Sequence, residues 1–285
     1  MLFLLSIFLI VGVIPVQSQT PVANARQLVR QGEIEYRAGE FVSAVNYLQE
    51  AVRVFESDED WQNLAITLTN LGRLQLSLGK AELALKSWEK ATEISEQLND
   101  DSAIVRDRIY QAEASEQLGL YERACVTLQS ALALDNNICA DPTFQILENK
   151  IKLVSPLQTT GWRSLGNVLR LLGNLEESEL VLQTIAKSSF DTEPATTRIS
   201  LGNTLRARGN IIRDRQASPK YDYLPWRCDA IKSNSSNLPP EAQNFYRQAQ
   251  QQYNRAIALS KLGNSKISAQ LNLLDLILKS DRFNL

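Results

Sequence analysis

The 285-residue sequence contains no histidine. Histidine is the usual general base, the usual partner of a nucleophilic serine or cysteine, and the commonest metal ligand, so the commonest forms of these sites are excluded. Cysteine is scarce as well: Cys125, Cys139 and Cys228 are far apart, and no two of them have the C-x-x-C spacing typical of zinc sites. We therefore expect no catalytic residue, no metal site and no cofactor, and predict that the protein is not an enzyme.

An excess of either charge is also lacking. The chain has 30 Lys and Arg residues against 32 Asp and Glu residues, a net charge of −2 and a pI near 5.5. Proteins that bind nucleic acid usually concentrate positive charge, so we expect no nucleic-acid partner. The hydrophobic content of 44% is too high for a disordered chain, so we expect a folded protein.

One long apolar run is present, at residues 2–16. It is shorter than the about 20 residues that span a membrane, and Val16 and Ser18 suit the −3 and −1 positions of a signal-peptide cleavage site. We predict a signal peptide over residues 1–18, export to the periplasm or the exterior, and no membrane span after cleavage. Basic residues, expected at the start of such a signal, are missing, and a buried N-terminal helix is the alternative.

The remainder of the chain repeats itself. Gly32, Gly72, Ala112, Gly166 and Gly202 follow one another at intervals of 40, 40, 54 and 36 residues. After most of them comes a second signal of small, large and small side chains. In three units this signal consists of Ala44, Leu48 and Ala51, then Ala84, Trp88 and Ala91, then Ala124, Leu128 and Ala131. Such a period is typical of stacked helical hairpins, since one hairpin cannot bury its apolar face alone.

Glycine recurs at two points of this pattern. Inside a helix it costs about 1 kcal/mol relative to alanine, so its recurrence there predicts the close approach of a large side chain. The candidates in successive units are Leu48, Trp88, Leu128 and Leu182. A second set is expected in turns, where a left-handed residue ends a helix, and comprises Gly39, Gly79, Gly119, Gly173 and Gly209.

These residues resemble the tetratricopeptide repeat. The nearest match to its pattern is Trp162-x-x-Leu165-Gly166, followed by Leu169, Gly173 and Leu175. The resemblance covers residues 23–285 and implies an all-α, right-handed superhelix of about five helix pairs plus a terminal helix. Two stretches break the repeat and are predicted to be insertions, near residues 132–158 and 214–241. The terminal helix is expected at residues 265–279, either as a cap or as part of a longer protein.

Two cysteines fall in the predicted insertions. Cys139 and Cys228 would form a disulfide if the insertions touch, since an oxidising compartment permits such a bond. Cys125 lies beside Ala124 inside a repeat helix and is expected to be a small core residue.

In the family that the repeats resemble, the first helix of each hairpin lines a concave surface. The fourth and fifth units share Ser-Leu-Gly-Asn-x-Leu-Arg, at residues 164–170 and 200–206, and the Asn and Arg of this motif lie on one helix face. Guanidinium groups bind carboxylates, and amides bind peptide backbone. By position, we predict a partner-binding surface that contains Arg163, Asn167, Arg170, Asn203, Arg206, Tyr36 and Arg73. The alternative is that these side chains only bond neighbouring helices of the array.

The predicted function is a non-enzymatic protein–protein interaction scaffold that binds a peptide or protein partner in its concave groove. The shared motif, the 40-residue units, the export signal and the cysteine-bearing insertions also resemble the N-terminal region of cyanobacterial proteins that join tetratricopeptide repeats to a caspase-like (CHAT) domain. That resemblance implies an alternative, in which the chain is the recognition or regulatory half of such a peptidase and the catalytic domain is absent from it. The sequence leaves the oligomeric state open.

Overall fold

The structure is a computed structural model that describes residues 21–134, 138–139, 147, 150–151, 155–217, 238–260 and 263–281. No strand occurs in this described part. None of its helices combines the length and the apolar composition that a membrane crossing requires. The helices are α1 (Pro21–Ala38), α2 (Phe41–Ser57), α3 (Trp61–Ser77), α4 (Ala81–Gln97), α5 (Asp101–Gln117), α6 (Tyr121–Ala131), α8 (Pro156–Leu171), α9 (Leu175–Ile185), α10 (Pro194–Ala217), α11 (Pro240–Leu259) and α12 (Asn264–Asp281).

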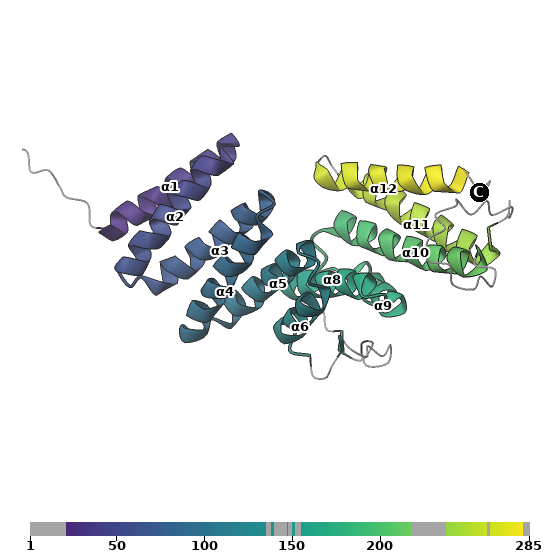
Figure 1. Cartoon of the computed structure of the whole chain (residues 1–285), viewed down its shortest axis with the longest axis horizontal. Coiled ribbons are helices and arrows are strands. Elements are labelled where there is room, and N and C mark those ends of the chain that lie inside the picture. Colours follow the sequence, from purple (N-terminus) through teal and green to yellow (C-terminus); the bar gives the residue numbers. More distant parts are fainter. Residues whose placement is uncertain are drawn as a thin grey trace, which may run out of the picture.

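The helices form hairpins that follow one another along a curved array, from α1 at one end to α12 at the other (Figure 1). Within the hairpins α1 packs on α2, α3 on α4, α5 on α6, α8 on α9 and α10 on α11. Each second helix also packs on the first helix of the next hairpin, and α12 packs on α11 and α10. The described residues confirm the predicted all-α superhelix of about five helix pairs plus a terminal helix.

The first helices form a continuous row through most of the array. Helix α3 contacts α5, α5 contacts α8, α8 contacts α10, and α10 contacts α12. The largest hydrophobic cluster extends from Ile109 of α5 to Leu276 of α12 and so joins several hairpins. Burial of apolar surface between neighbouring hairpins therefore holds the array together.

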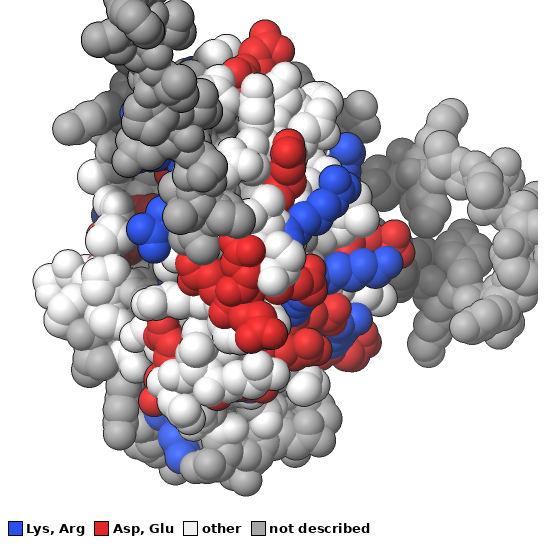
Figure 2. All heavy atoms as spheres, turned by 90° about the vertical axis from the view of Figure 1, so that its left-hand side faces the viewer, with Lys and Arg blue, Asp and Glu red and all other residues white. Residues whose placement is uncertain are grey.

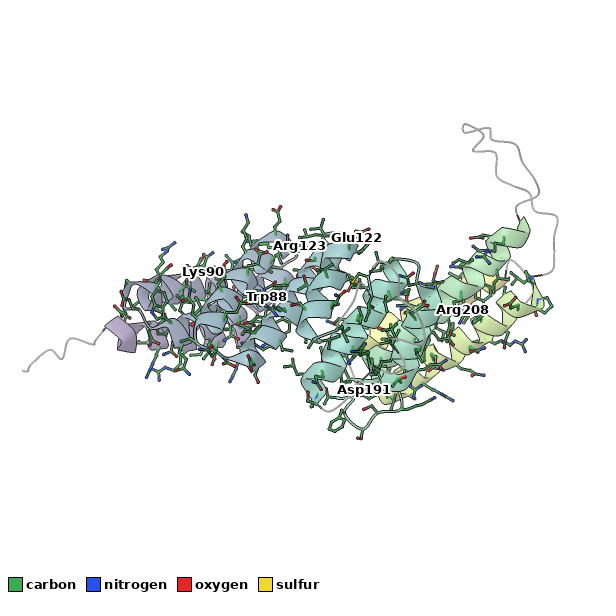
Figure 3. The ribbon with its side chains drawn as sticks, turned by 90° about the horizontal axis from the view of Figure 1, so that it is seen from below. Trp88, Lys90, Glu122, Arg123, Asp191 and Arg208 are labelled. Carbon is green, nitrogen blue, oxygen red and sulfur yellow. A yellow bond between two sulfur atoms is a disulfide. The ribbon has the colours of Figure 1, made fainter. Side chains whose placement is uncertain are left out.

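The two helices of a hairpin approach closely where the repeat pattern predicts it. A methyl group added at Gly72 would lie only 2.6 Å from the ring of Trp88, which is fully buried within the stack (Figure 3). Atoms in a packed core do not approach this closely, so the observed packing requires glycine at this position. The same kind of contact pairs Gly32 with Leu48, Gly166 with Leu182, and Gly202 with Tyr253.

Four of the five predicted turn glycines end a first helix. Gly39, Gly79, Gly119 and Gly173 have φ values from 72° to 91°, in the left-handed region that side chains disfavour. The fifth expectation, Gly209, is wrong, because α10 continues through this position to Ala217. A methyl group at Gly209 would lie 2.7 Å from Tyr246, so this glycine permits close packing of α10 on α11.

A disulfide joins Cys125 of α6 to Cys139 in the segment that follows (Figure 3). Their Cα atoms are 5.7 Å apart, a usual separation for such a bond. This corrects the expected bond between Cys139 and Cys228, because Cys139 is already engaged. Cys125 is buried as predicted, and the turn that ends α6 allows the chain to bring Cys139 back to it. Cys228 and the predicted signal peptide lie outside the described residues.

Reduction of the Cys125–Cys139 bond should lower the temperature of thermal unfolding. The bond spans 14 positions in sequence, and for a loop of about this size chain entropy predicts about 3 kcal/mol of stabilisation. Circular dichroism during heating, with and without reductant, measures the effect.

Two cysteine variants control this measurement. The double variant Cys125→Ala/Cys139→Ala should melt like the reduced protein and should not respond to reductant. The single variant Cys228→Ser should respond as the unaltered chain does. A loss of the response in Cys228→Ser would contradict the assigned pairing.

Candidate functional site

A cavity of about 440 Å³ lies between α1 and α3, in the first two hairpins. These two helices have little direct contact, unlike the first helices further along the array, so space remains between them. The cavity brings together Tyr36 and Arg73, two of the residues predicted to bind a partner. Its full lining is Val29, Gly32, Glu33, Tyr36, Arg37, Leu48, Asn70, Arg73, Leu74 and Ser77.

The cavity has an apolar floor and a polar rim. Leu48 and Leu74 are buried at its base. Tyr36 is 52% exposed at the rim, and its ring lies 5.6 Å from the ring of Phe41. Arg37 and Arg73 are exposed, and neither forms an ion pair with another described residue. The site is therefore suited to an apolar group below and a carboxylate above.

Arg163, predicted to face a partner, is instead buried inside the array. Its side chain is 6% exposed, and its guanidinium donates to Asp191 at 3.3 Å and to Glu193 at 2.9 Å. Both carboxylates come from the segment between α9 and α10, which folds over this part of α8. This corrects the expectation for Arg163: its charge is neutralised within the protein and fixes the position of that segment.

Two residues of the shared motif on α10 bond neighbouring helices. The side-chain oxygen of Asn203 accepts a hydrogen bond of 2.9 Å from the hydroxyl of Tyr253. Arg206 donates to Asp275 of α12 at 2.7 Å. Burial raises the pKa of Tyr253 to about 12, although the nearby positive charge of Arg206 acts in the opposite direction. For Asn203 and Arg206 the structure thus supports the alternative prediction, that these side chains bond neighbouring helices of the array.

The Asn and Arg of the same motif on α8 form no hydrogen bond or ion pair with a neighbouring helix in the described part of the array. Asn167 and Arg170 are half-buried, and the Nε atom of Arg170 is buried without a hydrogen-bond acceptor among the described residues. Burial lowers the pKa of Arg170, while the carboxylate of Glu116 on α5 raises it. Arg170 therefore lies near the carboxylate of Glu116, and its buried Nε atom makes no hydrogen bond with the described residues.

Glu113 and Glu116 form an acidic pair one turn apart on α5. Burial raises the pKa of both carboxyls, and for Glu113 the carboxylates of Glu116 and Glu193 raise it further, while the positive charges of Arg163 and Arg73 lower it. The side chain of Glu113 still reaches water, since it is exposed. The repeat phase places both residues on the inner face of a first helix, but it does not reveal the extent of their desolvation.

The sequence also identified Leu48 only as a packing residue and did not reveal its place in the cavity floor.

Charges of both signs occur on the end of the array formed by α1 and α2. Figure 2 views the molecule from this side, and acidic side chains gather near the middle of the face with basic side chains at its edge. Uncharged side chains cover much of the remaining described surface in this view. The described residues of this face therefore form no extended basic patch of the kind that binds nucleic acid without sequence specificity.

Comparison with known proteins supports this architecture. Residues 25–97, which include most of α1 and all of α2 to α4, match the family model of the tetratricopeptide repeat. The fold is that of tetratricopeptide repeats. A Podosopora anserina protein, described as a kinesin light chain with nearly identical TPR-like repeats, has a TM-score of 0.53 and 14% identity, over 83% of this chain and 98% of that one. The apo form of RapI has a TM-score of 0.54 and 14% identity, over 94% and 87% of the two chains.

At these identities the two solved structures establish a common fold and nothing more. No curated protein matches the sequence significantly. The fold presents the extended concave surface on which solenoid repeat proteins bind other proteins. Site chemistry must therefore be argued from the residues of this chain.

Replacement of Arg163 should lower stability. The Arg163→Met variant leaves Asp191, whose side chain is 4% exposed, without its partner. Removal of one member of a buried ion pair costs about 3–5 kcal/mol, and urea unfolding measures the loss. Arg73→Met removes an exposed arginine of the cavity rim and should change stability by less than about 0.5 kcal/mol. Equal stabilities of the two variants would contradict the structural role of Arg163.

The pair Glu113→Gln and Glu116→Gln should stabilise the protein at neutral pH. The carboxyls have higher pKa values in the folded state than their usual 4.5, so the folded state binds protons more tightly. When the pH is above their pKa in the folded state, ionisation of these carboxyls lowers the free energy of unfolding. This loss disappears when the pH falls below about 4.5. Unfolding by urea at several pH values should show that the gain of the double variant over the unaltered chain vanishes on acidification.

Glu50→Gln, on the exposed surface of α2, serves as the control for this measurement. It should show no comparable gain at neutral pH. A gain of the double variant that persisted at pH 4 would show that the effect does not arise from ionisation.

Proposed function

We propose that this protein is a non-enzymatic interaction scaffold whose concave groove binds an extended or helical peptide of a protein partner. The cavity between α1 and α3 is the anchoring point. An apolar side chain of the peptide enters over Leu48 and Leu74, and Arg37 or Arg73 binds a carboxylate that follows it. Peptide-binding grooves commonly combine apolar pockets with a few polar contacts that set the register.

One observation carries this proposal. Among the predicted binding residues, Tyr36 and Arg73 line a cavity and keep their binding groups exposed. Arg163 and Arg206, by contrast, are engaged in ion pairs within the protein. Arg73 attracts the carboxylate of Glu113 but forms no ion pair with another described residue, so a partner that bound it would break no such pair. The N-terminal part of the groove is therefore the favoured site.

We also propose that the protein works in an oxidising compartment after export. Disulfides persist in secreted and periplasmic proteins and are rare in the cytosol. The bond between Cys125 and Cys139 fits this location. It is separate evidence from the apolar run at residues 2–16, from which the signal peptide is predicted. Resemblance to repeats joined to a caspase-like domain stays a prediction, as does the lack of enzymatic activity.

A photo-crosslinking amino acid at position 36 tests the binding site. In the native compartment it should form a crosslink to one contiguous segment of a protein, identified by mass spectrometry. The same amino acid at position 126, which is 57% exposed on the second helix α6, should not crosslink to that segment. Equal crosslinking from both positions would show that the groove is not the site.

A synthetic peptide with the crosslinked sequence then measures the contribution of the rim. Arg73→Glu should weaken peptide binding about 10- to 100-fold in calorimetry, since it removes a charge-assisted hydrogen bond and adds repulsion. Arg53→Glu, an exposed arginine on the second helix α2, is the matched control and should bind normally. Unchanged affinity in Arg73→Glu would overturn the assignment of the rim.

A further inference from the structure

Charges of alternating sign line the inner face of the first three hairpins. Glu33 of α1, Arg73 of α3 and Glu113 of α5 occupy the same repeat position, at intervals of 40 residues. All three are exposed, and none of them forms an ion pair with another described residue. Each charge therefore keeps its hydrogen-bonding capacity for a group from outside the protein.

Helices α3 and α5 lie side by side in this part of the groove. The hydroxyl of Thr69 on α3 donates to Asp107 on α5 at 3.0 Å, and Arg73 follows Thr69 by one helical turn. Burial raises the pKa of Glu113, and the positive charge of Arg73 acts in the opposite direction, so the two charges are near enough to attract each other. The axes of packed helices are typically about 8–10 Å apart. We expect a similar separation between the sites at Arg73 and Glu113, because both have the same repeat position.

A second carboxylate makes the site on α5 strongly negative. Glu116 lies one turn beyond Glu113, and the two like charges repel each other. Arg163 attracts Glu113, but its guanidinium is already bonded to Asp191 and Glu193. Residues three positions apart on a helix have Cβ atoms about 5–6 Å apart. A single guanidinium, which has five N–H donors, can therefore bind both carboxylates of α5.

This acidic pair lowers the stability of the protein without a ligand. Burial raises the pKa of both carboxyls, and Arg170 lowers that of Glu116 without forming an ion pair with it. Desolvated groups that oppose stability are typical of binding sites, where the structure is arranged for a ligand. A positive group from a partner would remove the repulsion between Glu113 and Glu116.

An extended peptide matches the separation of the two sites. In the polyproline II conformation a chain has three residues per turn and rises about 3.1 Å per residue, so residues three positions apart lie on one face about 9 Å apart. In an α-helix three residues rise only about 4.5 Å. We propose that the groove selects an extended segment in which an acidic residue, bound by Arg73, is three positions from a basic residue, bound by Glu113 and Glu116. This inference rests on the proposed function, because it specifies the peptide that the groove binds.

Selection from a phage-displayed library of random peptides tests the charge pattern. Peptides that bind the unaltered chain should carry an acidic and a basic residue three positions apart. Selection on Glu113→Gln/Glu116→Gln should retain the acidic residue and lose the basic one, whereas selection on Arg73→Gln should do the reverse.

The matched control for this selection is Glu50→Gln/Glu93→Gln. It removes two exposed carboxylates from the second helices α2 and α4, and it should select the same peptides as the unaltered chain. Circular dichroism should show equal helix content in all these variants.

Calorimetry with one selected peptide locates the basic residue. Its replacement by glutamine should weaken binding to the unaltered chain about 10-fold, because charge-assisted hydrogen bonds are lost. The same replacement should weaken binding to Glu113→Gln/Glu116→Gln by less than about twofold, since the carboxylates that it needs are already gone. Equal weakening in both proteins would show that the basic residue binds elsewhere and would overturn the inference.

The outcomes also separate this inference from the function on which it rests. Selected peptides that need Arg73 but carry no basic residue contradict the charge pattern alone. A basic residue seven positions away would indicate a helical peptide and contradict the extended conformation. A library without binders, or binders that Arg73→Gln does not affect, would contradict the proposed groove as well.

Discussion

The array depends on one contact that recurs in four of its five described hairpins, in which a glycine of the first helix receives a large side chain from the second. Gly72 with Trp88 and Gly202 with Tyr253 show it at its closest. The contact brings two helix backbones together and fixes their rotation relative to each other. That rotation decides which residues face the next hairpin and which face the groove. A side chain on the glycine would therefore disturb the groove as well as the core.

The polar residues of the inner face divide into two groups as a result. Where first helices lie in a continuous row, from α3 to α12, many polar side chains find partners on the neighbouring helix. Asp107 of α5, for example, is fully buried and accepts hydrogen bonds from Thr69 of α3. Where the row opens, between α1 and α3, side chains such as Arg73 face a cavity instead. The same repeat position is thus structural in one hairpin and free for binding in another.

The repeat phase was sufficient to predict the helix pairs and their close contacts, because these follow from the local spacing of small and large residues. It could not predict how segments without a repeat phase would fold over the helices. Arg163 stands at a position of the inner face, yet Asp191 and Glu193 reach it from the segment between α9 and α10. Cys139 likewise belongs to no repeat, and its nearness to Cys125 depends on the turn after α6. Such residues carry no periodic signal that a single sequence displays.

The identity of the large residue also influences the chemistry of the groove. Tyr253 fills the space at Gly202 and continues beyond it, so that its hydroxyl bonds Asn203. Trp88 fills the space at Gly72, and its indole N–H donates to the backbone carbonyl of Thr69 at 3.1 Å. In the first hairpin the same position holds Leu48, which is shorter and has no polar end. Together with the little direct contact between α1 and α3, this short side chain leaves the cavity whose floor it forms. Leu182 occupies the same position in the fourth hairpin, where α8 and α10 are in contact, so the cavity depends on the opening of the row as well as on the packing residue.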